Sequence, residues 1–382
     1  MKKIKNLKSV LHLSHTDIRC DSRILKSMEA LKLAGASIYG IGLVARDIKD
    51  REIIHNQFSI RTLSLFSRNF KIPMPIRHLV NLLEFYAKSI KIGIKLKPQI
   101  IHCNDHIVLP IALILKIFGR SKVIYDAHEL ESCNTDQSLI ERHFIRNFER
   151  IMWPFIDSLI VVSPSIQKWY QLHFASKDSY IVLNSPSIKK ITEIKNDYLR
   201  SKFNIDKETK IFVYVGYFQH GRGLETILKY FSDAEENICL VLLGYGPYLS
   251  KIKDYSNNIN NIYIHDCVHH EKVVPILKSA DIGICLVEND SLNNYYSLPN
   301  KFFEYIFAGL PVLASDFPDI KDLVERDKFG CCVNPKNYES VKEGIKKLTK
   351  SFEEYEIQFS NLEVLSWESQ TQELLKCYSN LI

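Results

Sequence analysis

The chain has 382 residues, of which 46% are hydrophobic and 25% are charged, so it is a globular protein too long for one core, and two domains are expected. Its longest apolar run, from Ile107 to Leu115, is about half a membrane span, and the apolar stretch behind its basic N-terminus is too short for a secretion signal. Nine scattered cysteines argue against a disulfide framework, so a cytoplasmic protein is expected.

The net charge of +6 is concentrated in one segment, because residues 61–97 carry eight basic side chains and one acidic one. The same segment has leucines and isoleucines at helical spacing. A basic amphipathic helix over 71–97 is typical of proteins that bind an anionic membrane surface. A core helix with a solvated face fits equally well, and the sequence leaves both open. No aromatic platform accompanies the charge, so nucleic acid is not an expected partner.

Apolar strands alternate with helical patterns along the chain, which predicts an α/β fold with parallel sheets. A strand over 8–14 precedes a polar loop and a helix over 22–33 that Gly35 ends. In such folds, ligands meet the loops at the carboxyl ends of the strands. The polar side chains expected at this rim are His15, Asp17, Asp21 and Arg23. The alternative for Asp21, a helix N-cap, is favoured.

Further strands are expected at 37–44, 58–66, 98–103 and 123–125, and each is followed by polar residues or a helix. Asp105 follows the third of these strands, and His128 and Glu129 follow the fourth. A lone histidine after a strand is usually a polar loop residue. Strands at 158–163 and 179–183 precede the turn cluster 184–187, where the periodicity lapses and a hinge is expected.

A second α/β series begins with a strand that ends at Gly216, and the next strand ends at Gly244. A dinucleotide fingerprint here needs a third glycine at position 249, which is Leu249, so NAD is not expected.

The stretch 295–316 is the most informative of the chain. Pro299 suits the first turn of a helix and Gly309 its left-handed exit, while an apolar stripe of three phenylalanines and Ile306 buries one face. Asn300 and Glu304 share the other face. A helix N-terminus with a carboxylate one turn in can hold a phosphate and a sugar hydroxyl together. An ordinary α/β unit with a solvated glutamate fits the same pattern.

SLPNKFFEYIFAGLPVLAS at 297–315 resembles the donor-site segment of the GT-B glycosyltransferases, specifically the retaining group 1 (family 4) enzymes. DAHE at 126–129 is similar to the motif whose histidine lies against the donor sugar, and GRG at 221–223 resembles the phosphate loop. The resemblance implies two Rossmann-like domains across a cleft. The acceptor domain is expected over 1–184, completed by a crossing helix over about 365–382, and the donor domain over 185–364.

The implied reaction moves a sugar, with retention, from a UDP- or GDP-sugar to a lipid-linked or polysaccharide acceptor, in cell-surface glycan synthesis at the cytoplasmic membrane face. His128, Glu304 and Arg222 are the expected catalytic residues, and neither metal nor cofactor is expected. The implied donor-binding residues are Gly216, Arg222, Gly244, Val268, Tyr296, Ser297, Leu298, Asn300, Lys301 and Glu304. The implied acceptor-side residues are His15, Asp17, Asp21, Arg23, Asp105 and Glu129.

One departure from the family pattern concerns the sugar. The family commonly has two glutamates with seven residues between them, and Tyr296 stands where the first belongs. Either the sugar is recognised through Tyr296, Asn294 and backbone amides, or the donor differs. Apart from this departure, two alternatives to the transferase stay open: a sugar-nucleotide epimerase of the same fold, and a non-catalytic sugar-nucleotide-binding assembly subunit.

Overall fold

The computed structural model describes residues 4–44, 51–55, 58–135, 137–188, 196–234, 237–355 and 357–382. The chain forms two compact units, Met1–Val182 with Thr371–Ile382, and Leu183–Gln370. The domain limits expected from the sequence lie near the limits of these two units. Whether each expected domain folds on its own remains a prediction. Among the described residues, no helix has both the length and the hydropathy that crossing a membrane requires.

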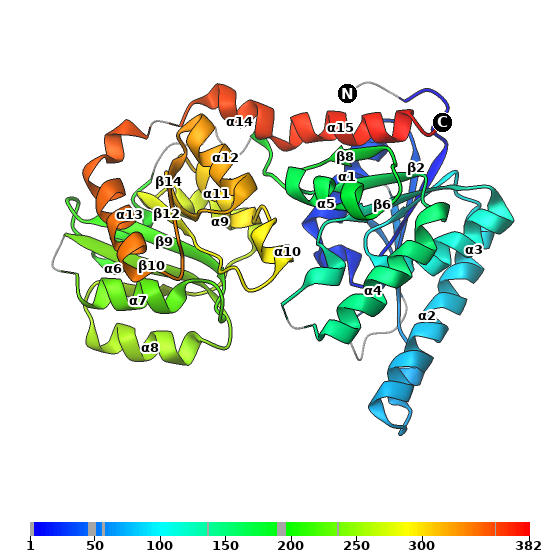
Figure 1. The fold of residues 1–382 in the computed structure, drawn as a ribbon, viewed down its shortest axis with the longest axis horizontal. Helices are drawn as coiled ribbons and strands as arrows, with labels where there is room; N and C mark the ends of the chain where they lie inside the picture. The colour runs from blue at the N-terminus through cyan, green and yellow to red at the C-terminus, as the bar shows by residue number, and fades with distance from the viewer. Residues whose placement is uncertain are drawn as a thin grey trace. The chain divides into compact units, whose positions relative to one another are not determined.

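The first unit, which holds the labelled strands β2, β6 and β8 in Figure 1, is built on an eight-stranded sheet. The strand order is β3-β4-β2-β1-β5-β6-β7-β8. Every neighbouring pair is parallel except β3 and β4. The strands are β1 (Ser9–Leu13), β2 (Ser37–Leu43), β3 (Arg51–His55), β4 (Phe58–Leu63), β5 (Ile100–Cys103), β6 (Lys122–Ala127), β7 (Ser158–Val161) and β8 (Ser179–Ile181). The helices are α1 (Ser22–Leu33), α2 (Met74–Leu96), α3 (Leu109–Gly119), α4 (Leu139–Met152) and α5 (Pro164–His173), with short 3₁₀ turns between elements.

Local sequence signals set the ends of α1 and α2. The Asp21 carboxylate accepts hydrogen bonds from the first-turn backbone N–H groups of α1, and Gly35 follows its end in the left-handed region, at φ 101°. Helix α2 starts after Pro73 and buries only a narrow stripe, which includes Gly93. A Cβ on Gly93 would lie 2.4 Å from the Leu115 side chain of α3, so a larger residue here would have to displace that leucine.

The second unit is built on a six-stranded parallel sheet with the order β11-β10-β9-β12-β13-β14. The strands are β9 (Lys210–Tyr217), β10 (Ile238–Tyr245), β11 (Ile262–His265), β12 (Ile282–Cys285), β13 (Val312–Ser315) and β14 (Gly330–Val333). The helices are α6 (Tyr198–Phe203), α7 (Leu224–Ser232), α8 (Leu249–Asn258), α9 (Val273–Leu277), α10 (Leu292–Tyr295), α11 (Asn300–Phe307), α12 (Pro318–Asp327), α13 (Tyr338–Lys350) and α14 (Phe359–Leu365). Both sheets therefore confirm the predicted α/β class with Rossmann-like strand order.

Helix α11 forms as the sequence predicts. Pro299 is its N-cap, and Gly309 follows its end at φ 80°. Phe302, Phe303 and Ile306 are fully buried, and each contributes roughly 1.5–3 kcal/mol of apolar transfer free energy. The buried stripe fixes which way the polar face of α11 points.

The last helix, α15 (Trp367–Ser379), starts in the second unit, and its residues from Thr371 onward belong to the first. The Trp367 backbone N–H donates to the Pro186 carbonyl at 2.9 Å within the second unit. Within the first unit, the Tyr378 hydroxyl is 2.6 Å from Nδ1 of His102 on β5.

Candidate active site

The strand order of the second unit reverses between β9 and β12, which pair in register at Ile282 and Phe212. In open α/β sheets, ligands bind outside the carboxyl ends of the strands at such a reversal. The loop after β9 and the loops and helix α11 after β12 carry most of the residues that the sequence predicts for the donor. The topology therefore places the candidate donor site at this edge.

Two glycines shape the strand tips at this edge. Gly216, near the end of β9, has φ 134°, and a Cβ there would meet nothing within 4 Å, so its backbone is open to a ligand. Gly244 lies beside it near the end of β10, and a Cβ there would be 1.9 Å from the Gly216 carbonyl oxygen. Gly244 thus allows the ends of β9 and β10 to approach each other. Its predicted role in donor binding is therefore to shape the backbone.

The loop after β9 presents the predicted arginine between two glycines in the left-handed region, Gly221 at φ 76° and Gly223 at φ 67°. The amide of Gln219, with its oxygen turned toward Arg222, accepts from Nε and Nη2, both at 3.3 Å. A Cβ on Gly221 would lie 2.7 Å from Asp290 Oδ2, so this loop packs directly on the loop after β12. The guanidinium is thereby oriented at the edge of the sheet.

Glu304 lies one turn into α11 and is not the solvated glutamate that the alternative interpretation required. Its side chain is 10% exposed, and its Oε1 is 3.4 Å from Nδ1 of His270. Asn300, the first residue of α11, is exposed. Sequence reasoning missed His270; the signal was a pair of histidines just after Cys267 and Val268, in the loop already expected to hold the base.

The charges of this site converge around Cys285, the last residue of β12. Burial raises the pKa of the Cys285 thiol to about 11, while the charges of Lys301 and Arg222 lower it and that of Glu304 raises it. Charges act on a buried group in this way only from nearby. Lys301 Nζ also lies 4.1 Å from the ring centroid of Tyr214 on β9, a cation–π distance. Two cations and one carboxylate, one from the loop after β9 and two from α11, therefore lie near the end of β12.

The short helix α10 and the loop after it hold the position of the missing glutamate. Tyr296 is half-buried at the end of α10, and its ring is 5.5 Å from that of Tyr295. The Ser297 hydroxyl donates to the Asn294 carbonyl at 2.8 Å, and Leu298 is buried. The loop thus offers aromatic and backbone groups where the family has a carboxylate.

The acidic residues nearest before Tyr296 in the sequence, Glu288 and Asp290, pair with a lysine. Lys336 Nζ, just after β14, lies 2.7 Å from Asp290 Oδ1 and 4.0 Å from Glu288 Oε2. The Glu288 backbone N–H also donates to the Gly221 carbonyl at 2.9 Å. The loops after β9, β12 and β14 are tied together by these contacts. Lys336 was not predicted, because its partners are 46 and 48 residues away in sequence.

The loop between β11 and the 3₁₀ turn His270–Lys272 contains the residues expected to meet the nucleotide base. Val268 is half-buried and Cys267 is exposed. This loop follows the carboxyl end of β11, on the same edge of the sheet as the loops after β9 and β12.

The strand order of the first unit reverses between β1 and β5, where a histidine and a carboxylate meet. His15 Nδ1 lies 2.8 Å from Asp105 Oδ2, and the His15 backbone N–H donates to the same oxygen at 3.0 Å. Burial lowers the pKa of His15, but the hydrogen bond and charge of Asp105 raise it above its usual value. This pair marks the carboxyl edge of the first sheet.

The remaining acceptor-side residues divide by their partners. Asp17 binds the Arg19 guanidinium, with Arg19 Nε donating at 2.8 Å. Asp21 is the N-cap of α1, which confirms the favoured alternative for that residue. Glu129 is exposed and accepts from Asn134 Nδ2 at 3.4 Å.

Arg23 departs from the expectation that it lies at the rim. Its side chain is 5% exposed, because its guanidinium pairs with buried Asp126, with Nη2 2.8 Å from Oδ1. His128, two residues further along, is 27% exposed, with Nδ1 3.7 Å from the same carboxylate. Burial lowers the pKa of His128, but Asp126 raises it above its usual value.

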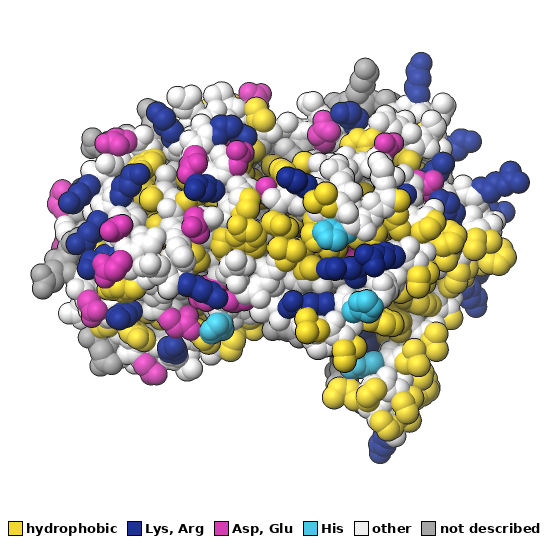
Figure 2. All heavy atoms as spheres, in the orientation of Figure 1, with side chains coloured by type: hydrophobic (Ala, Val, Ile, Leu, Met, Phe, Trp, Pro, Cys, Tyr) yellow, Lys and Arg dark blue, Asp and Glu magenta, His cyan; other side chains and the backbone are white. Residues whose placement is uncertain are grey.

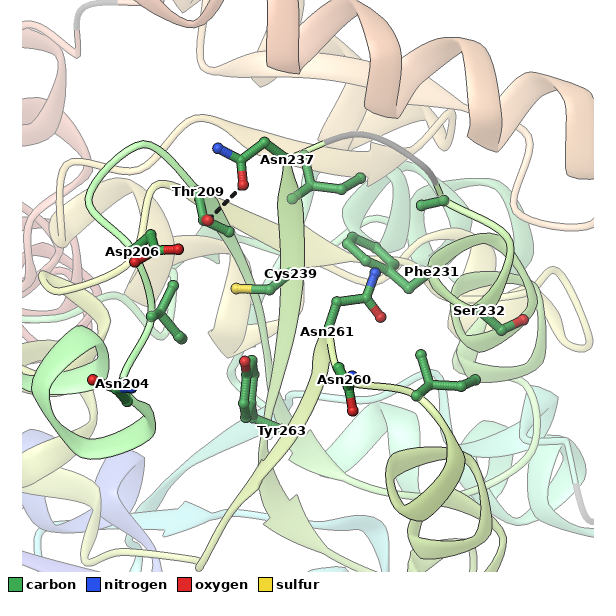
Figure 3. A pocket seen from close by; sticks show the side chains of 14 residues that line it. Asn204, Asp206, Thr209, Phe231, Ser232, Asn237, Cys239, Asn260, Asn261 and Tyr263 are labelled. Atoms are coloured by element: carbon green, nitrogen blue, oxygen red, sulfur yellow. Dashed lines mark hydrogen bonds between the residues drawn. The ribbon is translucent and has the colours of Figure 1, made fainter.

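A pocket of about 400 Å³ lies at the opposite edge of the second sheet, beside the amino ends of β9, β10 and β11 (Figure 3). Its lining includes several asparagine amides, Thr209 and the Tyr263 ring, and Thr209 donates to Asn237 across the rim at 2.6 Å. None of the residues predicted for the donor lines it. The volume of this pocket therefore does not identify the candidate donor site. The site is located instead by the charged side chains that gather at the carboxyl edge of the sheet.

The described residues hold no group of three or more His, Cys, Asp and Glu side chains arranged to bind a metal ion. The expectation that the protein needs no metal or cofactor stays a prediction.

Comparison with known proteins adds to this geometry. Residues 195–360 match the family described as "Glycosyl transferases group 1". An uncharacterized glycosyltransferase of Methanocaldococcus jannaschii is 23% identical over 365 residues, covering 90% of this chain and 91% of the relative. Among solved structures, sucrose-phosphate synthase of Thermosynechococcus elongatus superposes with a TM-score of 0.78 at 17% identity, covering 98% and 99% of the two chains. Anabaena HepE in complex with UDP-glucose has a TM-score of 0.71 at 12% identity, covering 97% and 99%.

Two Rossmann-like units of this kind define the GT-B fold class. Within that class, residues 195–360 match group 1, and the chain is a glycosyltransferase enzyme that uses a nucleotide sugar. The predicted GT-B fold class, the resemblance to group 1 glycosyltransferases and the enzyme type are confirmed, whereas family 4 and retention stay predictions. The epimerase and the non-catalytic subunit gain no support.

Proposed function

We propose that the protein transfers a sugar from a UDP- or GDP-sugar, with retention of configuration, to a lipid-linked or polysaccharide acceptor in cell-surface glycan synthesis. The observation that carries the proposal is the convergence of Arg222, Lys301 and Glu304 around the end of β12. Two cations suit the diphosphate, and a buried carboxylate suits the ribose hydroxyls. The UDP-glucose complex of HepE, which shares the fold, supports a UDP-linked donor.

In this proposal each donor group has a partner in the second unit. The guanidinium of Arg222 and the ammonium of Lys301 hold the diphosphate, together with the amides around Ser297 and Leu298 at the start of α11. Glu304, beside His270, accepts hydrogen bonds from the ribose. The loop at Val268 holds the base through backbone groups.

The bond between the anomeric carbon and the diphosphate oxygen breaks, and its electron pair leaves with the diphosphate. Arg222 and Lys301 stabilise the negative charge that develops there, which is the main electrostatic contribution to the rate. The acceptor hydroxyl attacks the same face of the sugar and gives its proton to the departing phosphate. His128 contacts the donor sugar from the first unit. These cations supply the positive charge, so the transfer proceeds without a metal ion.

The acceptor is proposed to come from an anionic membrane surface at the cytoplasmic face. Supporting this, Met74, Leu79 and Leu83 on α2 are each more than half exposed, and exposed Lys91 and Lys95 follow them on the same helix. The exposed apolar surface continues onto neighbouring helices, with Ile117 and Phe118 on α3 and Leu139, Ile140, Phe144 and Ile151 on α4. Figure 2 shows hydrophobic side chains gathered over α2 and α3. A patch of apolar and basic side chains suits headgroups and acyl chains together.

The test is a transfer assay with UDP- and GDP-sugars and lipid-linked or glycan acceptors. Release of the nucleoside diphosphate is expected only with an acceptor, and the new glycosidic bond is expected to keep the anomeric configuration of the donor. Release without an acceptor would indicate an epimerase instead. An inverted product would contradict the proposed mechanism.

A further inference from the structure

A carboxylate is buried at the end of β6, directly behind the predicted catalytic histidine. Asp126 is 2% exposed and accepts from Arg23 on α1 twice, from Nε at 3.1 Å and from Nη2 at 2.8 Å. Arg23 in turn donates through Nη1 to the Val182 carbonyl at 2.8 Å. A planar fork of this kind fixes both oxygens of the carboxylate in space.

A second chain of contacts reaches the same carboxylate from the last helix. The Tyr378 hydroxyl of α15 lies 2.6 Å from His102 Nδ1, and His102 Nε2 lies 3.3 Å from Asp126 Oδ2. Burial raises the pKa of Tyr378 well above its usual value, so the hydroxyl keeps its proton and donates it. His102 Nδ1 is then the acceptor, which leaves the proton on Nε2 to donate to Asp126. The His12 ring stacks on His102 at 4.4 Å between centroids and closes this cluster.

His128 is the remaining neighbour of the carboxylate. Its Nδ1 lies 3.7 Å from Asp126 Oδ1, longer than a hydrogen bond and within the range of an ion pair. That nitrogen is buried, while the side chain as a whole is 27% exposed. The ring therefore has one nitrogen directed into the cluster and part of its surface available to substrate.

We propose that Asp126 is a positioning residue that holds His128 by Nδ1 and leaves Nε2 for an oxygen of the sugar substrate, and that Tyr378 fixes this arrangement through His102. The inference rests on the proposed function in one respect, which is that the sugar substrate contacted by His128 comes from that function. It assigns the sugar contact to Nε2, the ring nitrogen that does not face Asp126. It also gives α15 a part in the site beyond packing.

The charges around His128 agree with this assignment. Burial lowers the pKa of His128, whereas the nearby charge of Asp126 raises it, Arg23 lowers it, and Asp21 raises it. The result is a pKa above the usual value of a histidine. His102 acts on the same carboxylate but is itself held neutral, because burial lowers its pKa.

The test is an NMR titration of His128 in the full-length chain without substrate, with the signal assigned from a His128→Gln variant. In Asp126→Asn, the pKa of His128 is expected to fall by about one unit, because the nearby opposite charge is lost. Asp178→Asn removes an exposed carboxylate of the same unit and is expected to leave the titration unchanged. A folded Asp126→Asn chain with an unchanged His128 pKa would overturn the proposal.

Tyr378→Phe, which removes a single hydroxyl, gives a second test that holds even if Asp126→Asn does not fold. Without the hydroxyl, His102 no longer has to donate to Asp126, so the carboxylate acts more strongly on His128 and its pKa is expected to rise. A titration identical to that of the unaltered chain would contradict the role given to Tyr378.

Kinetics separate this inference from the proposed function. Where transfer is measurable, Asp126→Asn is expected to lower kcat while KM for the nucleotide sugar changes little, since the second unit binds the nucleotide. An unaltered kcat would count against positioning. Absence of transfer in the unaltered chain, with the titration shifts present, would defeat the proposed function and leave the positioning intact.

Discussion

Replacing Glu304 by glutamine tests the donor site with the smallest change of shape. The carboxylate is 10% exposed and lies 3.4 Å from His270, in a place where little water compensates for its loss. A hydrogen bond to a charged group contributes about 1.5–3 kcal/mol. Glutamine keeps one acceptor oxygen, so the expected loss is about 2 kcal/mol, or about 30-fold in the Kd for the nucleoside diphosphate.

The assay is isothermal titration calorimetry with UDP and GDP. Glu325→Gln is the matched control, because Glu325 is an exposed glutamate on α12 of the same unit, and its removal is expected to leave the Kd unchanged. If Glu304→Gln binds both nucleotides within about twofold of the unaltered protein, the ribose assignment is wrong.

Three further changes probe the strand tips, a buried acid and the membrane surface. Gly244→Ala places a Cβ 1.9 Å from a carbonyl oxygen at φ 155°, so urea denaturation is expected to show a loss of about 3 kcal/mol, and an unchanged midpoint would contradict this packing. Glu149 is buried, which raises its pKa to about 7 from the usual 4.5 although two tyrosines donate to it. The folded chain then binds more protons than the unfolded chain between these values, so stability falls by about 3 kcal/mol as pH rises through them. Glu149→Gln is expected to raise stability at pH 8 and change it little at pH 4; an equal effect at both would refute the shift. Replacing Lys91 and Lys95 by glutamine is expected to weaken binding to anionic liposomes by about 2 kcal/mol in low salt, and unchanged binding would remove the membrane proposal.

The sequence predicts helix α11 well because its signals are local. Pro299, the apolar stripe and Gly309 each act within one turn of the helix, and the structure places all of them as expected. The parallel pairing of the strands follows from the alternation of strands and helices along the chain.

The partners of the charged residues were not predictable from local patterns. His270 meets Glu304 from 34 residues away, and Arg23 meets Asp126 from 103 residues away. A rim position was expected for Arg23 because it follows a strand, but the buried carboxylate holds it inside. Pairs of residues so far apart in the sequence cannot be predicted from local spacing.

Short or atypical elements were also missed. Strands β3 and β14 have five and four residues, lengths at which periodicity does not separate a strand from other structure. Helix α4 buries Glu149 and exposes Phe144 and Ile151, so its pattern is the reverse of the usual one for a surface helix.

The central claim is that a nucleotide sugar binds at the carboxyl edge of the second sheet, and hydrogen–deuterium exchange with UDP-glucose or GDP-mannose tests it most directly. Protection is expected in 216–223, 265–270 and 296–304. No protection by any nucleotide sugar, or protection confined to the asparagine-lined pocket at the opposite edge, would contradict the account.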